Sequence, residues 1–197
     1  MSKQSATCRG EGRAHPAGAT AAAAATAAAL LVLLAGCTTM RAAPEPAVPE
    51  VLRPSPKETL ILKAHAVGVQ IYVCQVNHDD PARFDWVFKA PEAQLFDKAG
   101  KPIIKHYAGP SWEALDGSKV VGEVVSKDNG PDPMAIPWLL LHAKSTSGNG
   151  PLSQTQSIQR LNTVGGKAPE GGCGAGLVGS EVRVHYTADY VFYRAGF

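Results

Sequence analysis

The sequence predicts an all-β protein, with a single β-sandwich or barrel-like domain that follows a signal peptide and a Pro-rich tether. Two observations carry this prediction. Short apolar runs recur about every ten residues and are split by Gly, Pro and Asp, a spacing typical of sandwiches and barrels. No window outside residues 17–36 shows a sustained helical period, so we expect no long amphipathic helix in the domain.

Residues 1–36 have the pattern of an export signal. Residues 1–16 carry three basic side chains and one acidic side chain, and residues 17–36 carry no charge. A basic start, an apolar run and small residues at its end are typical of a secretory signal. The run ends in Leu34-Ala35-Gly36-Cys37, which resembles the cleavage box of bacterial lipoproteins. Two alternatives stay open: an uncleaved transmembrane helix, which about 20 apolar residues can form, and a plain secretory signal.

The resemblance to a lipoprotein box implies that Cys37 becomes the lipidated N-terminus. Several acyl chains anchor a protein stably, whereas one chain does so only marginally. Thr rather than Asp stands at residue 38, which by analogy with enterobacterial sorting favours the outer membrane, facing the periplasm. Residues 37–57 hold five prolines and no apolar period, and we expect them to form a semi-extended tether. The β-rich domain is expected at residues 58–197.

The cysteines support export. Cys8 is removed with the signal and Cys37 carries the lipid, which leaves Cys74 and Cys173. In the oxidising cell envelope, two remaining cysteines predict one disulfide bond, which here closes a loop of about 100 residues. Two buried, unlinked thiols are the alternative.

The first expected strands lie at residues 60–66 and 69–76, separated by Gly68. The second is apolar on both faces, which indicates a central strand. Residues 83–89 alternate aromatic and other side chains, as a half-buried strand does. Gly122 is expected to form a bulge or a close contact. The remaining strands are expected at residues 93–96, 102–107, 118–127, 136–144 and 181–195. A buried helical turn is the alternative for residues 137–145, because Leu favours helices over strands.

Charge excludes some partners. Without residues 1–36 the chain has 16 basic and 16 acidic residues, so its net charge is zero. Nucleic-acid affinity depends mainly on phosphate neutralisation by basic residues, so no nucleic-acid partner is expected. The same balance argues against a polybasic membrane surface, which leaves the lipid anchor as the membrane contact.

The sequence signals no cofactor or metal. Gly174–Gly179 matches a dinucleotide fingerprint by its letters, but loop sequence precedes it, a strand follows it, and no βαβ unit fits. The histidines show none of the spacings of zinc sites. The Asn77–Pro81 segment lacks the calcium-loop pattern and is interpreted as a solvated turn.

Two stretches could bind a ligand. The most unusual is "HYAGPSWEALDGS" from His106 to Ser118, where His106, Tyr107 and Trp112 flank a Gly-Pro turn. Such aromatics can stack on sugars or apolar ligands; the alternative is a β-corner whose Trp112 fills the core. The second is Arg160, which could bind a carboxylate with two parallel hydrogen bonds or only brace a loop.

Five segments, in order, carry a family likeness: "GVQIYVCQ" (68–75), "HYAGPSWEALDGSKVVGEV" (106–124), "AIPWLLLHAKS" (135–145), "IQRLNTVGGKAPEGGC" (158–173) and "VHYTADYVFY" (184–193). Together they resemble the exported family called domain of unknown function 3455. The likeness covers about residues 60–197. It implies an exported, β-rich protein and carries over no activity or catalytic residue.

Three functional hypotheses follow. The first is a noncatalytic cell-envelope module that binds a small molecule or a glycan through His106, Tyr107, Trp112, Trp138 and Arg160. The second is a structural or partner-binding envelope protein. The third is an envelope hydrolase or isomerase in which His106 and Glu113 act as acid and base.

Overall fold

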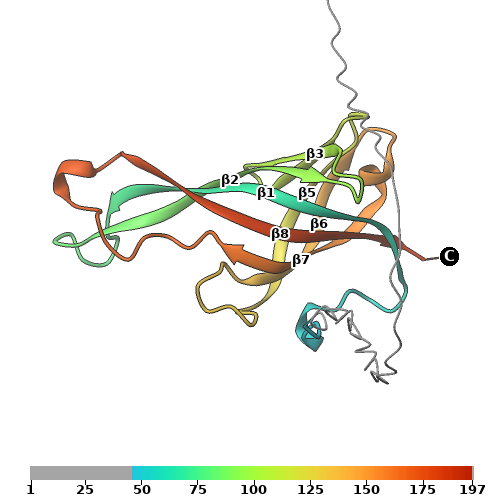
Figure 1. Cartoon of the computed structure of the whole chain (residues 1–197), viewed down its shortest axis with the longest axis horizontal. Helices are drawn as coiled ribbons and strands as arrows, with labels where there is room; N and C mark the ends of the chain where they lie inside the picture. The colour runs from blue at the N-terminus through green and yellow to red at the C-terminus, as the bar shows by residue number, and fades with distance from the viewer. Residues whose placement is uncertain (1–45, 197) are drawn as a thin grey trace, which may run out of the picture. The chain divides into compact units, whose positions relative to one another are not determined.

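The computed structural model describes residues 46–196, which form one eight-stranded antiparallel barrel (Figure 1). Each strand pairs with the next, and β8 pairs with β1 to close the ring. The all-β prediction is confirmed, and the barrel is the alternative that forms. The strands are β1 (Glu58–Val76), β2 (Phe84–Phe96), β3 (Pro102–Tyr107), β4 (Ser111–Ala114), β5 (Lys119–Asp128), β6 (Trp138–Ser147), β7 (Thr155–Gly165) and β8 (Glu181–Ala195).

The described residues also contain three short 3-10 helices, η1 (Glu50–Leu52), η2 (Pro151–Gln154) and η3 (Ala175–Leu177). None of the helices within residues 46–196 has the length and hydropathy that a bilayer crossing requires. The predicted signal peptide, Cys37 and the first part of the tether lie outside the described residues.

The prediction that Gly68 separates two strands is wrong. β1 runs through Gly68 without a break. A Cβ atom at Gly68 would lie 2.3 Å from the Glu92 carbonyl oxygen and 2.5 Å from Ala93 Cα. The glycine therefore lets β1 and β2 approach closely instead of ending a strand. Gly122 behaves as expected, because the β5–β6 register shifts beside it and its missing Cβ leaves room for Trp112.

The interior is packed at the end of the barrel near η2. Leu152 of η2 is fully buried and belongs to the main core cluster with Val120, Ile158 and Phe192. The Ser118 hydroxyl accepts a hydrogen bond from the Leu152 amide, which fixes η2 against the turn before β5. Small residues line β1 here, since Ala64 and Ala66 are buried opposite the large aromatics of the other strands. This end of the barrel is therefore filled by side chains.

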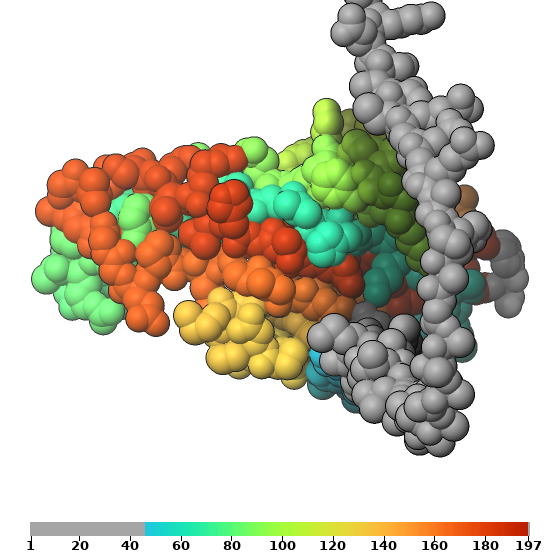
Figure 2. Space-filling model, in the orientation of Figure 1, coloured from blue at the N-terminus to red at the C-terminus, as the bar shows by residue number. Residues whose placement is uncertain are grey.

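Strands β1, β2 and β8 continue beyond the other strands as a long extension (Figure 1). The turn between β1 and β2 and the glycine-rich 166–180 loop form its far end in the space-filling view (Figure 2). The sulfur atoms of Cys74 and Cys173 lie 2.01 Å apart, so the cysteine pairing predicted from the sequence forms at disulfide distance. The Trp86 indole also donates to the Gly171 carbonyl at 2.9 Å. These contacts fasten the loop to the extension.

Part of the predicted tether is folded against the barrel. Leu52 is fully buried on the outer face with Trp138, Leu140 and Leu161, and Val48 packs on the same cluster. The Leu52 carbonyl accepts a hydrogen bond from Gln159 Nε2 at 2.6 Å. The folded unit thus reaches upstream of the expected boundary at residue 58, at least to Val48.

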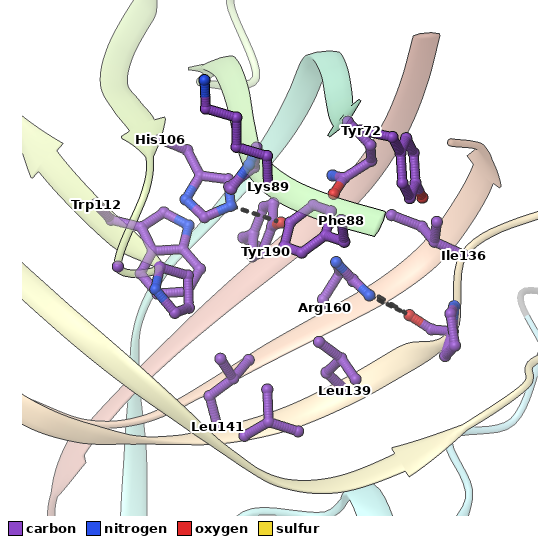
Figure 3. Close-up of a pocket in the computed structure, with 16 residues that line it drawn as sticks. Tyr72, Phe88, Lys89, His106, Trp112, Ile136, Leu139, Leu141, Arg160 and Tyr190 are labelled. Carbon is purple, nitrogen blue, oxygen red and sulfur yellow. Dashed lines mark hydrogen bonds between the residues drawn. The ribbon is translucent and has the colours of Figure 1, made fainter. Parts of the chain in front are cut away.

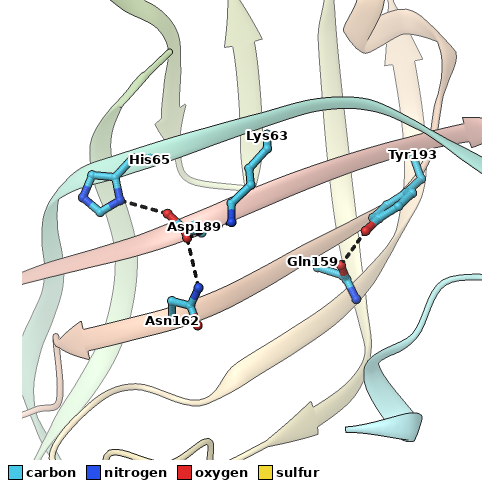
Figure 4. A network of polar contacts seen from close by, with 6 residues as sticks. All are labelled: Lys63, His65, Gln159, Asn162, Asp189 and Tyr193. Atoms are coloured by element: carbon cyan, nitrogen blue, oxygen red, sulfur yellow. Dashed lines mark hydrogen bonds and ion pairs between the residues drawn. The ribbon is translucent and has the colours of Figure 1, made fainter. Parts of the chain in front are cut away.

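A polar network covers the outer face where β1, β8 and β7 adjoin (Figure 4). The Asp189 carboxylate accepts hydrogen bonds from His65 Nδ1 at 2.9 Å and Asn162 Nδ2 at 3.0 Å, and it lies 3.3 Å from Lys63 Nζ. Burial raises the pKa of Asp189, but these donors together hold that pKa below its usual value. The network links the three strands at the seam where the barrel closes.

Candidate functional site: a cavity in the barrel

A cavity of about 430 Å³ lies in the barrel, toward the end away from η2. Its volume falls in the range of small-molecule sites, and an eight-stranded barrel is just wide enough for one small ligand. Sixteen residues line it (Figure 3). They are Gln70, Tyr72, Phe88, Lys89, Pro91, His106, Gly109, Pro110, Trp112, Val124, Ile136, Pro137, Leu139, Leu141, Arg160 and Tyr190.

The lining is mostly apolar and aromatic. It contains no Asp or Glu, and it contains no Ser, Thr or Cys. Two side chains carry a positive charge, Lys89 and Arg160. Lys89 forms an ion pair with Glu181 at the exposed rim, so Arg160 is the cation that acts inside the cavity.

An aromatic cluster forms the floor. The His106 ring stacks on Trp112 with ring centroids 4.4 Å apart, and Tyr190 meets Trp112 edge-on at 5.4 Å. Phe192 contacts the other side of Trp112 at 6.1 Å. Because inward positions alternate along each strand, β3, β4 and β8 direct these four rings into the interior. Such a cluster is rigid, since each ring has few rotatable bonds and is held by its neighbours.

His106 is a neutral member of this cluster. The Ser111 carbonyl can only accept, so His106 Nδ1 donates to it at 2.9 Å. Nε2 is then the acceptor, and the Tyr190 hydroxyl donates to it at 3.2 Å. Burial lowers the pKa of His106 from 6.5 to about 3. Both ring nitrogens are occupied, so His106 shapes the floor and is not free to transfer protons.

Arg160 projects from β7 into the cavity (Figure 3). Its Nε and Nη2 atoms donate to the Pro137 carbonyl at 3.1 and 2.8 Å. No acidic side chain within residues 46–196 forms an ion pair with it. Burial raises the pKa of Tyr72 and of Tyr190, and the Arg160 charge acts in the opposite direction on both. The guanidinium thus faces phenols and apolar groups instead of a carboxylate.

Two residues of the lining carry N–H groups that are closed to solvent. Trp112 Nε1 makes no hydrogen bond within residues 46–196, whereas the Gln70 amide interacts with the Tyr186 hydroxyl. Gln70 is 2 % exposed and Trp112 is 1 % exposed. A buried polar group without a partner costs about 1–3 kcal/mol, and the Trp112 N–H is therefore a cost of packing this ring into the core.

The structure brings together three of the five residues proposed from sequence: His106, Trp112 and Arg160. Tyr107 follows His106 on β3 and therefore faces outward. Its hydroxyl donates to Glu113 at 2.6 Å, and Lys119 lies over its ring. Trp138 is buried in the outer cluster under Leu52, away from the cavity. Trp112 is both a core residue and part of the cavity floor, so the two interpretations of it are not exclusive.

The acid–base pair proposed for the enzyme hypothesis does not form. His106 pairs with Trp112 across β3 and β4, and both side chains point inward. Glu113 is the next residue on β4 and is exposed on the outer face, where it accepts from Tyr107. The sheet therefore lies between His106 and Glu113.

Sequence reasoning missed Gln70, Tyr72, Phe88 and Tyr190 as cavity residues. The signal for Tyr190 was its place on the inward face of the last strand, beside Tyr186 and Phe192. Phe88 and Tyr72 lie on the extension and meet edge-on at 5.8 Å at the mouth. No local pattern distinguishes such a rim residue from an ordinary half-buried strand residue.

Other predicted motifs lie in loops. Gly174–Gly179 contains one 3-10 turn within the loop fastened by Cys173, with no helix of the dinucleotide fold after it. Asn77 caps its own turn by accepting from the amides of Asp79 and Asp80. Within residues 46–196 no three His, Cys, Asp or Glu side chains gather in an arrangement that could hold a metal ion.

Within the described residues, the fold is a closed antiparallel barrel that holds a cavity of small-molecule size. The chain belongs to the family described as protein of unknown function (DUF3455), whose model matches residues 54–194. No curated protein and no solved structure shows significant similarity to the chain.

Proposed function

We propose that the protein is a noncatalytic binding module that takes one small, largely apolar molecule into the barrel. The observation that carries this proposal is the cavity of about 430 Å³, lined by aromatic and aliphatic side chains with the Arg160 guanidinium among them. Sites of this size and composition bury most of the surface of a small ligand. The affinity would come from the apolar area removed from water, at about 25 cal/mol per Å².

The lining favours binding over catalysis. Acyl or glycosyl transfer needs a nucleophile or a pair of carboxylates, and the lining contains no Ser, Thr, Cys, Asp or Glu. Its only histidine is held neutral with both nitrogens engaged. These features support the first sequence hypothesis over the hydrolase or isomerase.

The lining also favours a small apolar molecule over a glycan. A sugar ring presents many hydroxyl groups, each of which needs a polar partner once water is removed. Most of the lining consists of apolar side chains, including Val124, Ile136, Leu139 and Leu141. Burying a glycan against this wall would leave its hydroxyls without partners.

Binding of an uncharged apolar dye, N-phenyl-1-naphthylamine, tests the proposal. We expect a fluorescence increase that saturates at one dye per protein. Val124→Trp should abolish it, because Val124 lines the cavity and a larger side chain there occupies part of its volume. Val125→Trp is the matched control: Val125 is 47 % exposed against 49 % for Val124, and it does not line the cavity. Absence of binding, or equal loss in both variants, would contradict the proposal.

We also propose that the module works in the cell envelope, anchored through Cys37 to the outer membrane. The export pattern of residues 1–36 and the Leu-Ala-Gly-Cys box support this localisation. A Cys37→Ser variant should appear in the soluble periplasmic fraction, whereas the natural chain should sediment with membranes. Membrane association of the serine variant would count against the lipid anchor.

A further inference from the structure

We infer that the ligand is an amphipathic organic acid whose carboxylate is bound by Arg160 while its apolar part lies against Leu139 and Leu141. This inference rests on the binding role proposed above and names the chemical class of the ligand. It depends on the charge, the donors and the position of Arg160.

No acidic side chain within residues 46–196 forms an ion pair with the Arg160 guanidinium. Its side chain is only partly exposed, it lines the cavity, and no Asp or Glu lines the cavity with it. Moving a charge out of water is costly unless it is paired and hydrogen-bonded. An anionic ligand group would supply the missing partner at the place where the cavity holds its positive charge.

The donors of Arg160 are also suited to a carboxylate. A guanidinium has five N–H donors in a planar fork, and the described structure directs Nε and Nη2 to the single Pro137 carbonyl. That contact fixes the plane of the fork while donors remain for a ligand. A fixed fork matches the two oxygens of a carboxylate.

The composition of the lining is independent support. No Asp or Glu lines the cavity with Arg160, so a cationic ligand group would find no carboxylate there. Two acceptors of the lining are already engaged, because Arg160 donates to the Pro137 carbonyl and Tyr190 donates to His106 Nε2. The preference is therefore for an acceptor-rich, anionic head.

The position of Arg160 sets the orientation of the ligand. Figure 3 shows its guanidinium in the middle of the cavity, with Tyr190 and Phe88 to one side and Leu139 and Leu141 to the other. Lys89 points away from Arg160 at the rim and is paired with Glu181. A carboxylate on Arg160 leaves the aliphatic wall free for an alkyl or aryl group.

The test compares decanoate with decan-1-ol, which differ in the charged head, as competitors of the uncharged dye at pH 7.5. Arg160→Gln removes the charge but keeps an amide donor for the Pro137 carbonyl. We expect it to weaken decanoate binding at least tenfold, as loss of a charge-assisted hydrogen bond does, and to change decan-1-ol binding less than about twofold. Arg183→Gln, an exposed arginine paired with Glu92, should change neither.

The outcomes separate the two proposals. Equal weakening of both ligands by Arg160→Gln would mean that Arg160 only braces Pro137, and it would overturn the inference while leaving the binding role. Dye binding without decanoate binding would overturn it too. Failure of the wild-type protein to bind dye and both ligands would overturn the binding role itself. If Arg160→Gln does not fold, Arg160→Lys keeps the charge without the fork and should weaken decanoate selectively.

Discussion

His106 stacks on Trp112 with ring centroids 4.4 Å apart and planes inclined by only 12°. The pair forms across β3 and β4, in register, at the floor of the cavity. Because the imidazole is neutral and bonded through both nitrogens, it acts as a flat, rigid surface. A floor of this kind restricts the shape of what can enter.

The buried His106 should make stability depend on pH. Its pKa is lowered from the ordinary 6.5 to about 3 in the folded protein, so the unfolded chain binds the proton more readily. Its contribution is fully present above about pH 6.5 and is lost as pH falls toward 3. The free energy of unfolding should fall by roughly 1.4 kcal/mol per pH unit across this window. Urea unfolding at pH 7, 6 and 5 measures it.

The matched control for this dependence is the exposed His65. The slope between pH 6 and 5 should be reduced in His106→Gln relative to the wild-type protein and retained in His65→Gln. The same slope in all three proteins would show that His106 does not carry the dependence.

The bond between Cys74 and Cys173 should contribute strongly to stability. It spans a sequence separation of 99 residues, and restriction of so long a loop in the unfolded chain gives up to about 4–5 kcal/mol in the chain-entropy model. We expect the double variant Cys74→Ser, Cys173→Ser to lose about 2–5 kcal/mol in denaturant unfolding. A loss below about 1 kcal/mol, or a fully reduced mass for the exported protein, would argue against this role.

Substitution by alanine should lower the stability of the protein at one glycine and leave it nearly unchanged at another. Gly68→Ala places a Cβ 2.3 Å from backbone of β2, which must shift, and we expect a loss of about 1–3 kcal/mol or more. Gly176, inside the letters of the dinucleotide fingerprint, has nothing within 4 Å of its Cβ position, so Gly176→Ala should be close to neutral. Thermal unfolding of both variants compares them; a larger loss from Gly176→Ala would contradict the packing described for both sites.

Leu52 should anchor the segment before β1 to the barrel. Its side chain is 0 % exposed, whereas that of neighbouring Val51 is 58 % exposed. Truncation of a fully buried leucine costs about 2–5 kcal/mol, so Leu52→Ala should lower the free energy of unfolding by that amount, and Val51→Ala should change it by less than about 0.5 kcal/mol. Equal, small effects would mean that this segment is a free tether.

The sequence predicted the strands in which apolar and polar side chains alternate between the two faces, and those that are long apolar runs. The two strands that were missed, β4 and β7, show neither pattern. β7 carries Gln159 and Arg160 in its middle, and both of its faces are covered: Leu161 packs under Leu52 outside, and Ile158 lies in the core inside. β4 has only four residues. Residues 137–145 were ambiguous, and the pairing of β6 with β5 and β7 makes most of them a strand.

Only part of the candidate site could be predicted from the sequence. The type of a residue indicates which ligand groups it can bind, but it does not indicate whether the side chain faces the inside or the outside of the barrel. His106, Trp112 and Arg160 were proposed as aromatic and cationic binding groups, and all three face the interior. Tyr107 could have been set apart from His106 by strand alternation alone. Trp138 could not, because its burial depends on Leu52, more than 80 residues away in the chain and brought near only by the closed barrel.

The most direct test of the binding role is the mass of the exported Cys37→Ser protein, purified from the periplasm and recorded under native and denaturing conditions. We expect a small additional mass that is present in the native spectrum, absent from the denatured one, retained in Val125→Trp and lost in Val124→Trp. An additional mass that survives Val124→Trp would place the ligand outside the cavity. A native mass equal to that of the bare chain, together with no uptake of the dye, would contradict the account.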